Sequence, residues 1–367
     1  MVDYKDAGVN IELGDDVSKI LYNAARLTWK NRQGRLGEVV ELFPDFSGLR
    51  AIHVGNLPFD SYMNLGFDGI GTKVELAERT SHHNTVAFDL FAMVCDDAVV
   101  RGAEPVIVGS ILDVRSLEGN IEPVRQLAIG YIDAARAANV AIVNGEVAEL
   151  GARVQGYGSF NYNWGAGVVW FARKSRLFTG FEIKEHDKII ALRENGFRSN
   201  GISLVRKILT LTYGDEWHLE HFQGKSLGDQ VLHPSTIYTK AAVEMFGGFE
   251  NEPRAEVHGI AHITGGGIPG KLGRVLKPSN LGAYLEPFEP SDLMLHCQEK
   301  GEVSDKKAYE TWNMRHGMLI ISPQPDAVMH VAQEHGIESA VVGEITSKPG
   351  IRIKSQGLYD KNKELVF

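Results

Sequence analysis

Glycine is the residue type that most constrains how this chain can fold. It accounts for 40 of the 367 residues, about 11%, where about 7% is usual in globular proteins. The 13 prolines are not in excess. Because glycine has no Cβ, it lets the backbone approach a ligand closely, and exposed backbone N–H groups often bind phosphate. We therefore expect tight loops within an ordered fold, some of them beside phosphate groups.

Charge and hydrophobicity narrow the class of protein. Hydrophobic residues make up 43% of the chain, and the net charge is -9 without any concentrated block of Lys and Arg. The chain is long enough to bury the core of one large or two modest domains. A nucleic acid or an anionic membrane surface is not expected as a partner, because both select basic surfaces.

Several features indicate a cytoplasmic location. The only two cysteines, Cys95 and Cys297, lie in apolar, helix-like stretches and are expected to be buried thiols in a reducing compartment. No apolar run approaches the roughly 18 residues that a membrane span requires. The N-terminus has neither the basic nor the hydrophobic region of a secretory leader.

The spacing of apolar residues predicts an α+β protein with two domains. We expect residues 1–14 to form an arm that folds over another part of the chain, followed by a helix from residue 15 or 16 to residue 27. A first domain would cover residues 15–175 and a second residues 176–367, with a boundary in the polar stretch 173–187.

The expected elements of the two domains are as follows. In the first domain, helices are predicted over 85–102 and 122–139, and strands over 106–112, 140–143 and 166–172. In the second domain, helices are predicted over 201–211, 236–246 and 325–335, with strands over 188–192, near Ile260 and near Val341.

The segment Gly66-Phe-Asp-Gly-Ile-Gly-Thr-Lys73 is a candidate phosphate loop. Its glycines, Gly71 among them, could bring N–H groups to phosphate oxygens, and Lys73 adds a positive charge. Asp68 or Thr72 could hold a divalent cation. The spacing is not that of a Walker motif, and an ordinary turn with an exposed lysine is an equally good interpretation of this motif alone.

Carboxylates at several positions suggest a magnesium site. Asp89 and Asp96 are seven positions apart and share a helix face, whereas Asp97 lies about 100° further round. A solvated stripe is the commoner interpretation, since charges are costly to bury unless they are paired or bound to metal. The segment 144–146, Asn-Gly-Glu, follows an apolar strand, and carboxylates from separate elements suit Mg²⁺ that also binds substrate phosphates.

Two further segments place polar residues before helices. In Ser199-Asn200-Gly201, helix capping and anion binding are both open interpretations. In the segment from His262 to Gly267, three successive glycines are costly in conformational entropy, which favours a phosphate-binding role over a plain loop.

Taken together, these motifs resemble the phosphoribosylformylglycinamidine cyclo-ligase (AIR synthetase) family, a branch of a wider ATP-dependent superfamily. The resemblance covers nearly the whole chain and rests on YKDAGV, GFDGIGTK, FDLFAMVCDDAVVRGAEP, NGEVAE, SNGISLVRKIL, AHITGGG and TWNMRHGM. It implies an N-terminal domain whose strands join a barrel across a homodimer, with ATP near that interface, and a C-terminal α+β domain.

The resemblance also implies a reaction and a set of residues. ATP would phosphorylate the formyl amide oxygen of formylglycinamidine ribonucleotide, and ring closure would give 5-aminoimidazole ribonucleotide, AIR. His262 is implied as the proton-transfer residue, although a lone histidine beside a strand is more often structural. The implied metal ligands are Asp68, Asp97 and Glu146. The implied contacts to nucleotide or substrate are Lys5, Gly71, Thr72, Lys73, Ser199, Asn200, Thr264, Gly265 and Gly266, and the implied catalytic residues are His262, Lys73 and Asp68.

The sequence also departs from the family pattern. Residues 34–43 replace a Gly-Gly-Phe-Gly-type loop and carry two acidic residues, which would repel a phosphate. Arg198 replaces the histidine of Pro-His-Ser-Asn-Gly, and it has no proton to exchange near neutral pH. Arg315 and His316 replace glycines of the TWNMRHGM-type segment.

These departures leave two alternatives to the cyclo-ligase. One is another ATP-dependent enzyme of the same fold with a different acceptor. The other is a nucleotide-binding scaffold without turnover. Against this alternative, the chain retains four residues of the family pattern: Asp68, Lys73, Asp97 and Glu146.

Overall fold

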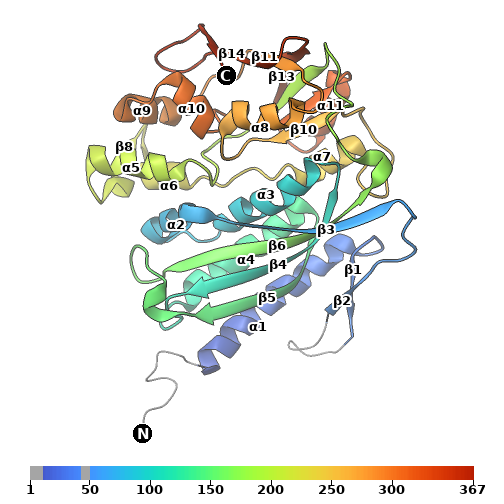
Figure 1. Cartoon of the computed structure of the whole chain (residues 1–367). Coiled ribbons are helices and arrows are strands. Elements are labelled where there is room, and N and C mark those ends of the chain that lie inside the picture. Colours follow the sequence, from blue (N-terminus) through green and yellow to red (C-terminus); the bar gives the residue numbers. More distant parts are fainter. Residues whose placement is uncertain (1–10, 43–49) are drawn as a thin grey trace. The chain divides into compact units, whose positions relative to one another are not determined.

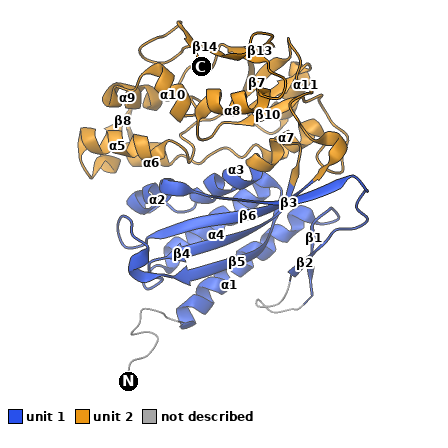
Figure 2. Ribbon diagram, viewed as in Figure 1, with its two compact units in different colours: residues 1–95, 105–171 blue, residues 96–104, 172–367 orange. Residues whose placement is uncertain are grey.

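The computed structural model describes residues 11–42 and 50–367. The chain divides into two compact units, the first up to Cys95 and over 105–171, the second over 96–104 and 172–367 (Figure 2). The second unit thus takes in a short segment that precedes most of it in sequence, which the pattern of apolar residues does not predict. The expected arm, with Lys5, lies largely outside the described residues.

The first unit begins with helix α1 (Ile11–Thr28), which buries Val17, Ala24 and Thr28. Residues 11–14, expected in the arm, belong to this helix, so that prediction was wrong for them. Glu12 lies in the first described turn of this helix, where an acidic side chain complements the helix dipole. Helix α1 packs along α4 (Ile121–Ala138) and strand β5 (Ala141–Glu149) (Figure 1).

The sheet of the first unit has the strand order β3-β6-β4-β5. Its strands are β3 (Ser61–Gly69), β6 (Tyr162–Arg173), β4 (Glu104–Val114) and β5. Strands β4 and β5 are parallel and are connected through α4, as a parallel pair requires a crossover. Helices α2 (Val74–Thr80) and α3 (Val86–Val99) lie between β3 and β4 in the chain.

One strand of this sheet is longer than predicted. Strand β5 was expected to end at residue 143, with Asn-Gly-Glu in the following loop. Instead, Asn144 to Glu146 lie within β5, because the ladder with β4 continues and pairs Gly109 with Asn144 and Ile111 with Glu146. These polar side chains are exposed on the sheet, so the sheet itself, and not a loop, positions Glu146.

The segment that replaces the expected glycine-rich loop forms part of a hairpin. Strand β1 (Glu38–Glu41) pairs antiparallel with β2 (Arg50–His53). The Glu41 carboxylate accepts a hydrogen bond from the Tyr22 hydroxyl at 3.0 Å and lies 3.7 Å from Arg26, so this acidic residue contacts α1. Phe43 lies outside the described residues.

The second unit is built on a seven-stranded sheet with the order β10-β12-β7-β13-β11-β14-β15. Strand β7 (Lys188–Arg193) lies between two antiparallel neighbours, and its apolar residues 189–192 are buried. The other strands are β10 (Gly259–His262), β11 (Gly282–Leu285), β12 (His316–Ser322), β13 (Ser339–Thr346), β14 (Gly350–Lys354) and β15 (Glu364–Val366). A separate hairpin pairs β8 (His221–Phe222) with β9 (Lys225–Ser226).

The second unit also contains several helices (Figure 1). They are α5 (Ile202–Tyr213), α6 (Leu227–Leu232), α7 (Thr239–Phe246), α8 (Gly267–Leu276), α9 (Asp292–Gly301), α10 (Asp305–Thr311) and α11 (Pro325–Glu334). The predicted helices of this unit are therefore confirmed, although α7 begins three residues later than expected. The strand near Val341 is not the last, because β14 and β15 follow it.

Two expectations from composition can be checked directly. Cys95 in α3 and Cys297 in α9 are buried, and neither forms a disulfide. Within residues 11–42 and 50–367, the structure has no helix that is both long and apolar enough to cross a membrane.

Candidate functional site

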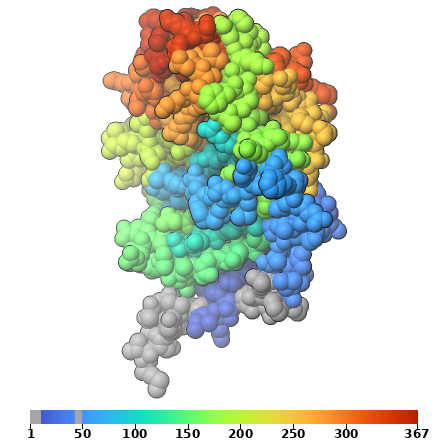
Figure 3. Space-filling view, turned by 45° about the vertical axis from the view of Figure 1, so that its right-hand side comes forward, coloured from blue at the N-terminus to red at the C-terminus, as the bar shows by residue number. Residues whose placement is uncertain are grey.

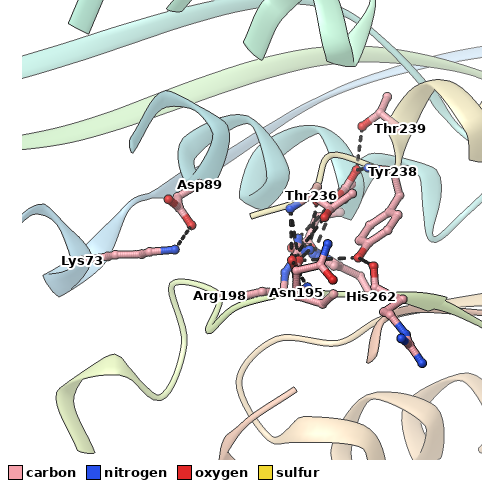
Figure 4. A network of polar contacts seen from close by, with 12 residues as sticks. Lys73, Asp89, Asn195, Arg198, Thr236, Tyr238, Thr239 and His262 are labelled. Atoms are coloured by element: carbon pink, nitrogen blue, oxygen red, sulfur yellow. Dashed lines mark hydrogen bonds and ion pairs between the residues drawn. The ribbon is translucent and has the colours of Figure 1, made fainter. Parts of the chain in front are cut away.

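A buried arginine organises the polar residues of the second unit. Arg198 follows β7 and precedes α5, and it is only 1% exposed. Its guanidinium donates to Glu194 Oε2 at 2.8 Å, to the Thr236 carbonyl at 3.0 Å and to Asp96 Oδ2 at 3.2 Å (Figure 4). A buried cation is tolerated only when it is paired and hydrogen-bonded in this way.

The two carboxylates around Arg198 are themselves held by backbone and hydroxyl donors. Asp96 accepts from the Tyr238 amide at 3.0 Å and from Thr239 Oγ1 at 2.8 Å. Glu194 accepts from the amide and the hydroxyl of Thr236. These contacts come from residues just before α7, which begins at Thr239 with Tyr238 as its N-cap.

Burial and charge shift the acid–base equilibria of this group in different directions. Burial raises the pKa of Asp96, and the neighbouring cationic and hydrogen-bond donors offset this only in part. Burial alone would lower the pKa of Arg198, but the carboxylates of Glu194 and Asp96 hold it above its ordinary value. Arg198 is therefore a permanent cation in this site.

His262 connects this buried group to a partly exposed carboxylate. It ends strand β10 and is 2% exposed. Its Nε2 lies 2.7 Å from Arg198 Nη2, and its Nδ1 lies 2.6 Å from Asp97 Oδ1. Burial favours a raised pKa for Asp97, but the hydrogen bond from His262 and the nearby positive charges of Lys271 and Arg198 outweigh burial and lower the pKa. Both ring nitrogens of His262 are thus engaged.

Two glycine-containing loops, one before α5 and one before α8, are neighbours of each other and follow Arg198 and His262 in the chain. Gly201, with a φ of 82°, is the N-cap of α5, and Gly266, with a φ of 93°, is the N-cap of α8. A Cβ at Gly265 would lie 3.4 Å from Asn200 Nδ2, so the loops are neighbours, and a Cβ at Gly267 would overlap the Tyr309 carbonyl oxygen. The N-termini of two helices therefore begin at adjoining loops, and the positive end of a helix dipole favours an anion.

Side chains in the first of these loops carry unsatisfied acceptors. Neither helix has a side-chain cap, so the capping interpretation of Ser199 was wrong. Ser199 Oγ and Asn200 Oδ1 are buried, and neither makes a hydrogen bond to the described residues. Buried polar atoms normally have partners, and a ligand bound at this loop could supply partners for these two atoms. Thr264, in the second loop, is buried as well.

In the first unit, Asp68 and Glu146 line one cavity of about 640 Å³. Asp68 lies in β3 and Glu146 in β5, and Asn144 and Gly145 line the same cavity. Two of the three predicted metal ligands are thus brought to one cavity, while Asp97 belongs to the second unit. In the described part of the chain, no cluster of three or more His, Cys, Asp or Glu side chains could hold a metal ion.

Lys73 does not have the position expected of an exposed lysine. Its Nζ lies 2.7 Å from Asp89 Oδ1, and both side chains are fully buried (Figure 4). Gly71 and Thr72, in the same short 3₁₀ turn, are exposed. The interpretation of Asp89 and Asp96 as a solvated stripe was also wrong, because each is buried against a cation, Lys73 or Arg198.

Sequence reasoning missed several residues of these groups. Glu194 is four positions before Arg198, a spacing that could have suggested a pair, but nothing marked Thr236 or Thr239. In the first unit, Glu78 accepts hydrogen bonds from the amides of Tyr157 and Tyr162. Burial raises its pKa to about 7, although these donors oppose the shift.

Comparison with known proteins accounts for both units. Two family models match the chain: AIR synthase related protein, N-terminal domain, over residues 52–166, and AIR synthase related protein, C-terminal domain, over residues 184–356. A phosphoribosylformylglycinamidine cyclo-ligase of Thermococcus gammatolerans is 32% identical over 98% of this chain and 99% of its own. The protein of the same name from Picosynechococcus is 33% identical over 95% and 98%.

Solved structures share the fold at low sequence identity. A thiamine-monophosphate kinase from Stenotrophomonas maltophilia superposes with a TM-score of 0.62 at 13% identity, covering 94% of this chain and 97% of its own. A hydrogenase maturation protein HypE in complex with ATP gives a TM-score of 0.56 at 12% identity, covering 86% of each chain. With domain matches in both units and relatives similar over their whole length, this two-domain α+β chain belongs to the AIR synthase related protein family.

Proposed function

We propose that this protein is an ATP-dependent cyclo-ligase that converts formylglycinamidine ribonucleotide to AIR in purine biosynthesis. The observation that carries the proposal is the likeness to proteins of that name over 98% of this chain and 99% of the relative. This similarity extends through both units. It therefore covers the residues that line the Asp68 and Glu146 cavity of the first unit and the two adjoining loops of the second.

The proposed reaction has two steps. The γ-phosphoryl group of ATP passes to the formyl amide oxygen, which turns a poor leaving group into a phosphate ester. The amidine nitrogen then attacks the same carbon, the C–O bond breaks, and phosphate leaves as the ring closes. Little covalent chemistry falls to the protein, so its contribution is positioning and neutralisation of charge. A relative of the same fold solved in complex with ATP supports the nucleotide assignment.

The residues present fit a magnesium ion. Mg²⁺ prefers oxygen ligands and is usually bound by one or two carboxylates together with substrate phosphates. Asp68 and Glu146 offer two carboxylates at one cavity of the first unit, and we assign Asp97, in the second unit, as a further carboxylate that can bind a divalent cation. When bound, the ion would neutralise charge on the transferring phosphoryl group. Asp97 suits this role because its pKa is lowered and its side chain is 49% exposed.

We assign the binding of anionic groups to the two adjoining loops of the second unit. Ser199 and Asn200 hold buried acceptors without protein partners, and Thr264 with Gly265 and Gly266 leads into α8. In the first unit, the exposed Gly71 and Thr72 remain proposed nucleotide contacts, as does Lys5 outside the described residues. Lys73 could contact phosphate only if its buried pair with Asp89 were opened or shared.

His262 is better suited to positioning than to proton transfer. It was predicted to transfer a proton, but each ring nitrogen already has a partner and the ring is almost fully buried. A proton relay would require one of these hydrogen bonds to open. We therefore assign His262 the role of holding Asp97.

A second copy of the chain is the proposed partner of the first unit's sheet. Strand β3 exposes Met63, Leu65 and Phe67, the last at 76%, and β4 exposes Ile111 at 56%. The blue segment that contains β3 lies at the surface in the space-filling view (Figure 3). Apolar surface of this kind favours burial against another protein. The net charge of -9 argues against nucleic acid, and two buried cysteines without a disulfide fit the proposed cytoplasmic location.

A direct assay tests the function. The protein is incubated with Mg²⁺, ATP and formylglycinamidine ribonucleotide, and both ADP and AIR are followed. AIR formed in equal amount to ADP is the expected result. ADP without AIR would overturn the choice of acceptor and favour a related phosphorylating enzyme, and the absence of both products would favour a non-catalytic nucleotide-binding protein.

A further inference from the structure

We propose that Arg198 is a positioning residue: it fixes which ring nitrogen of His262 carries the proton, and through His262 it orients the carboxylate of Asp97. The hydrogen bonds that carry this inference all lie within the second unit. Only the final consequence, that the oriented carboxylate binds a divalent cation, rests on the proposed function.

The tautomer of His262 follows from the chemistry of its neighbour. A guanidinium has N–H donors and no acceptor. Arg198 Nη2 lies 2.7 Å from His262 Nε2, so Nε2 must be the acceptor of this hydrogen bond. A proton on Nε2 would instead bring two N–H groups face to face at that distance. With Nε2 as an acceptor, Nδ1 is the ring nitrogen that donates to Asp97 Oδ1.

The proton on Nδ1 in turn holds Asp97. The distance of 2.6 Å between Nδ1 and Asp97 Oδ1 is short, as expected of a hydrogen bond to an ionised acceptor. Asp97 Oδ2 has no partner among the described residues, and the side chain is about half exposed. One carboxylate oxygen is thus anchored while the other remains available. A histidine held in one tautomer by a further residue is a common way to orient the groups around a metal.

Arg198 is itself fixed, as a positioning residue must be. Its guanidinium has four acceptors from different parts of the unit: Glu194 Oε2, the Thr236 carbonyl, Asp96 Oδ2 and His262 Nε2. Its Nη2 divides its two hydrogens between Asp96 and His262, so rotation about the guanidinium would break both bonds. Because an arginine does not lose its proton in proteins, its guanidinium presents only donors to His262 Nε2.

The charges that face this group are accounted for. Asp96 Oδ2 lies 3.9 Å from His262 Nε2, too far for a hydrogen bond. It therefore does not compete with Arg198 for that nitrogen. Lys271, from α8, contributes to the lowered pKa of Asp97.

The closing experiment measures the tautomer directly. The protein is labelled with ¹⁵N-histidine, and the two ring nitrogens of His262 are assigned by comparison with His262→Asn. We expect Nδ1 to resonate as a protonated nitrogen and Nε2 as an unprotonated one in the wild type. A protonated Nε2 in the wild type would overturn the proposal without any need for an Arg198 variant. The exposed Arg254, which pairs with Glu334 on the same unit, supplies the control: Arg254→Met should leave both resonances unchanged.

Variants then test the effect on Asp97, with Mn²⁺ alone as the probe and electron paramagnetic resonance as the readout. Arg198→Met and His262→Ala should each weaken Mn²⁺ binding about 10-fold or more, the usual effect of losing a residue that orients a metal ligand. His262→Asn keeps an N–H donor near Nδ1 and should retain most of the affinity. Equal affinity in all variants that fold would overturn the role of Arg198. Failure of the AIR assay with the expected tautomer and Mn²⁺ results would refute the proposed function alone.

Discussion

The buried pair of Lys73 and Asp89 allows a quantitative prediction. Both side chains are fully buried and their charged atoms lie 2.7 Å apart. Removing one partner of a buried ion pair leaves an uncompensated charge, which typically costs about 3–5 kcal/mol of folding free energy. We therefore expect Lys73→Met to lower the free energy of unfolding by about that amount.

The assay is urea unfolding of the full chain, followed by fluorescence and circular dichroism. The double variant Lys73→Met/Asp89→Leu removes both charges and should regain most of the loss, to within about 1 kcal/mol of the wild type. Arg136→Met is the matched control on α4, because Arg136 and Asp133 are 59% and 46% exposed. Such an exposed pair contributes less than about 1 kcal/mol.

One result would refute this reasoning. If Lys73→Met destabilised the protein by less than about 1 kcal/mol while strongly weakening ATP binding, Lys73 would be a nucleotide contact and its pair with Asp89 would be incidental. If stability fell as expected and ATP affinity in the double variant were unchanged, the predicted phosphate contact would be wrong.

Four further results are expected. Asp97→Asn should weaken Mn²⁺ and Mg²⁺-ATP binding by about 10-fold or more with an unchanged circular dichroism spectrum; unchanged binding would exclude Asp97 as a ligand. His262→Ala should weaken metal binding and turnover together, and a loss of kcat alone, without loss of metal affinity, would instead restore the proton-transfer role. Burial raises the pKa of Glu78 from 4.5 to about 7. Between these two pH values the native state therefore binds more protons than the unfolded state, and the free energy of unfolding should fall as the pH rises. Glu78→Gln should reduce this pH dependence, measured by urea unfolding at several pH values. Alkylating reagents should leave activity intact under native conditions, because Cys95 and Cys297 are buried, and rapid inactivation at Cys95 would contradict a structural role.

The sequence predicted the elements that follow a clear apolar period. The observed ends of strand β7 and of helices α5 and α11 lie within two residues of the predicted ends. Their buried apolar residues follow a regular spacing along the sequence. The extension of β5 through Asn144 to Glu146 was not predictable from hydrophobicity, because these residues are polar and their strand conformation depends on pairing with β4. Residues 11–14 of helix α1 were not predicted as helical for a similar reason: Ile11 is exposed and does not belong to the buried apolar face of the helix.

The candidate site shows the same division. The glycine loops before α5 and α8 were found because glycine marks positive φ, which Gly201 and Gly266 indeed adopt. Of the partners of Arg198, Glu194 lies only four positions away and could have been suggested by its spacing. Asp96 lies 102 positions away, and only the fold brings it to the guanidinium. Local sequence could identify Arg198 as a departure from the family pattern. It could not show which groups make a buried arginine stable.

The position of strand β7 links ligand binding to the stability of the second unit. The strand lies between β12 and β13 in the sheet, and the residues directly after it supply Glu194, Arg198 and the loop at Ser199. A ligand held by this loop binds only when the centre of the sheet is folded, so it must stabilise the whole sheet by mass action. At 100 times its dissociation constant, the stabilisation is about 2.7 kcal/mol. A shift in thermal unfolding of the second unit can therefore report which phosphorylated compounds the loop accepts, even before any reaction has been observed.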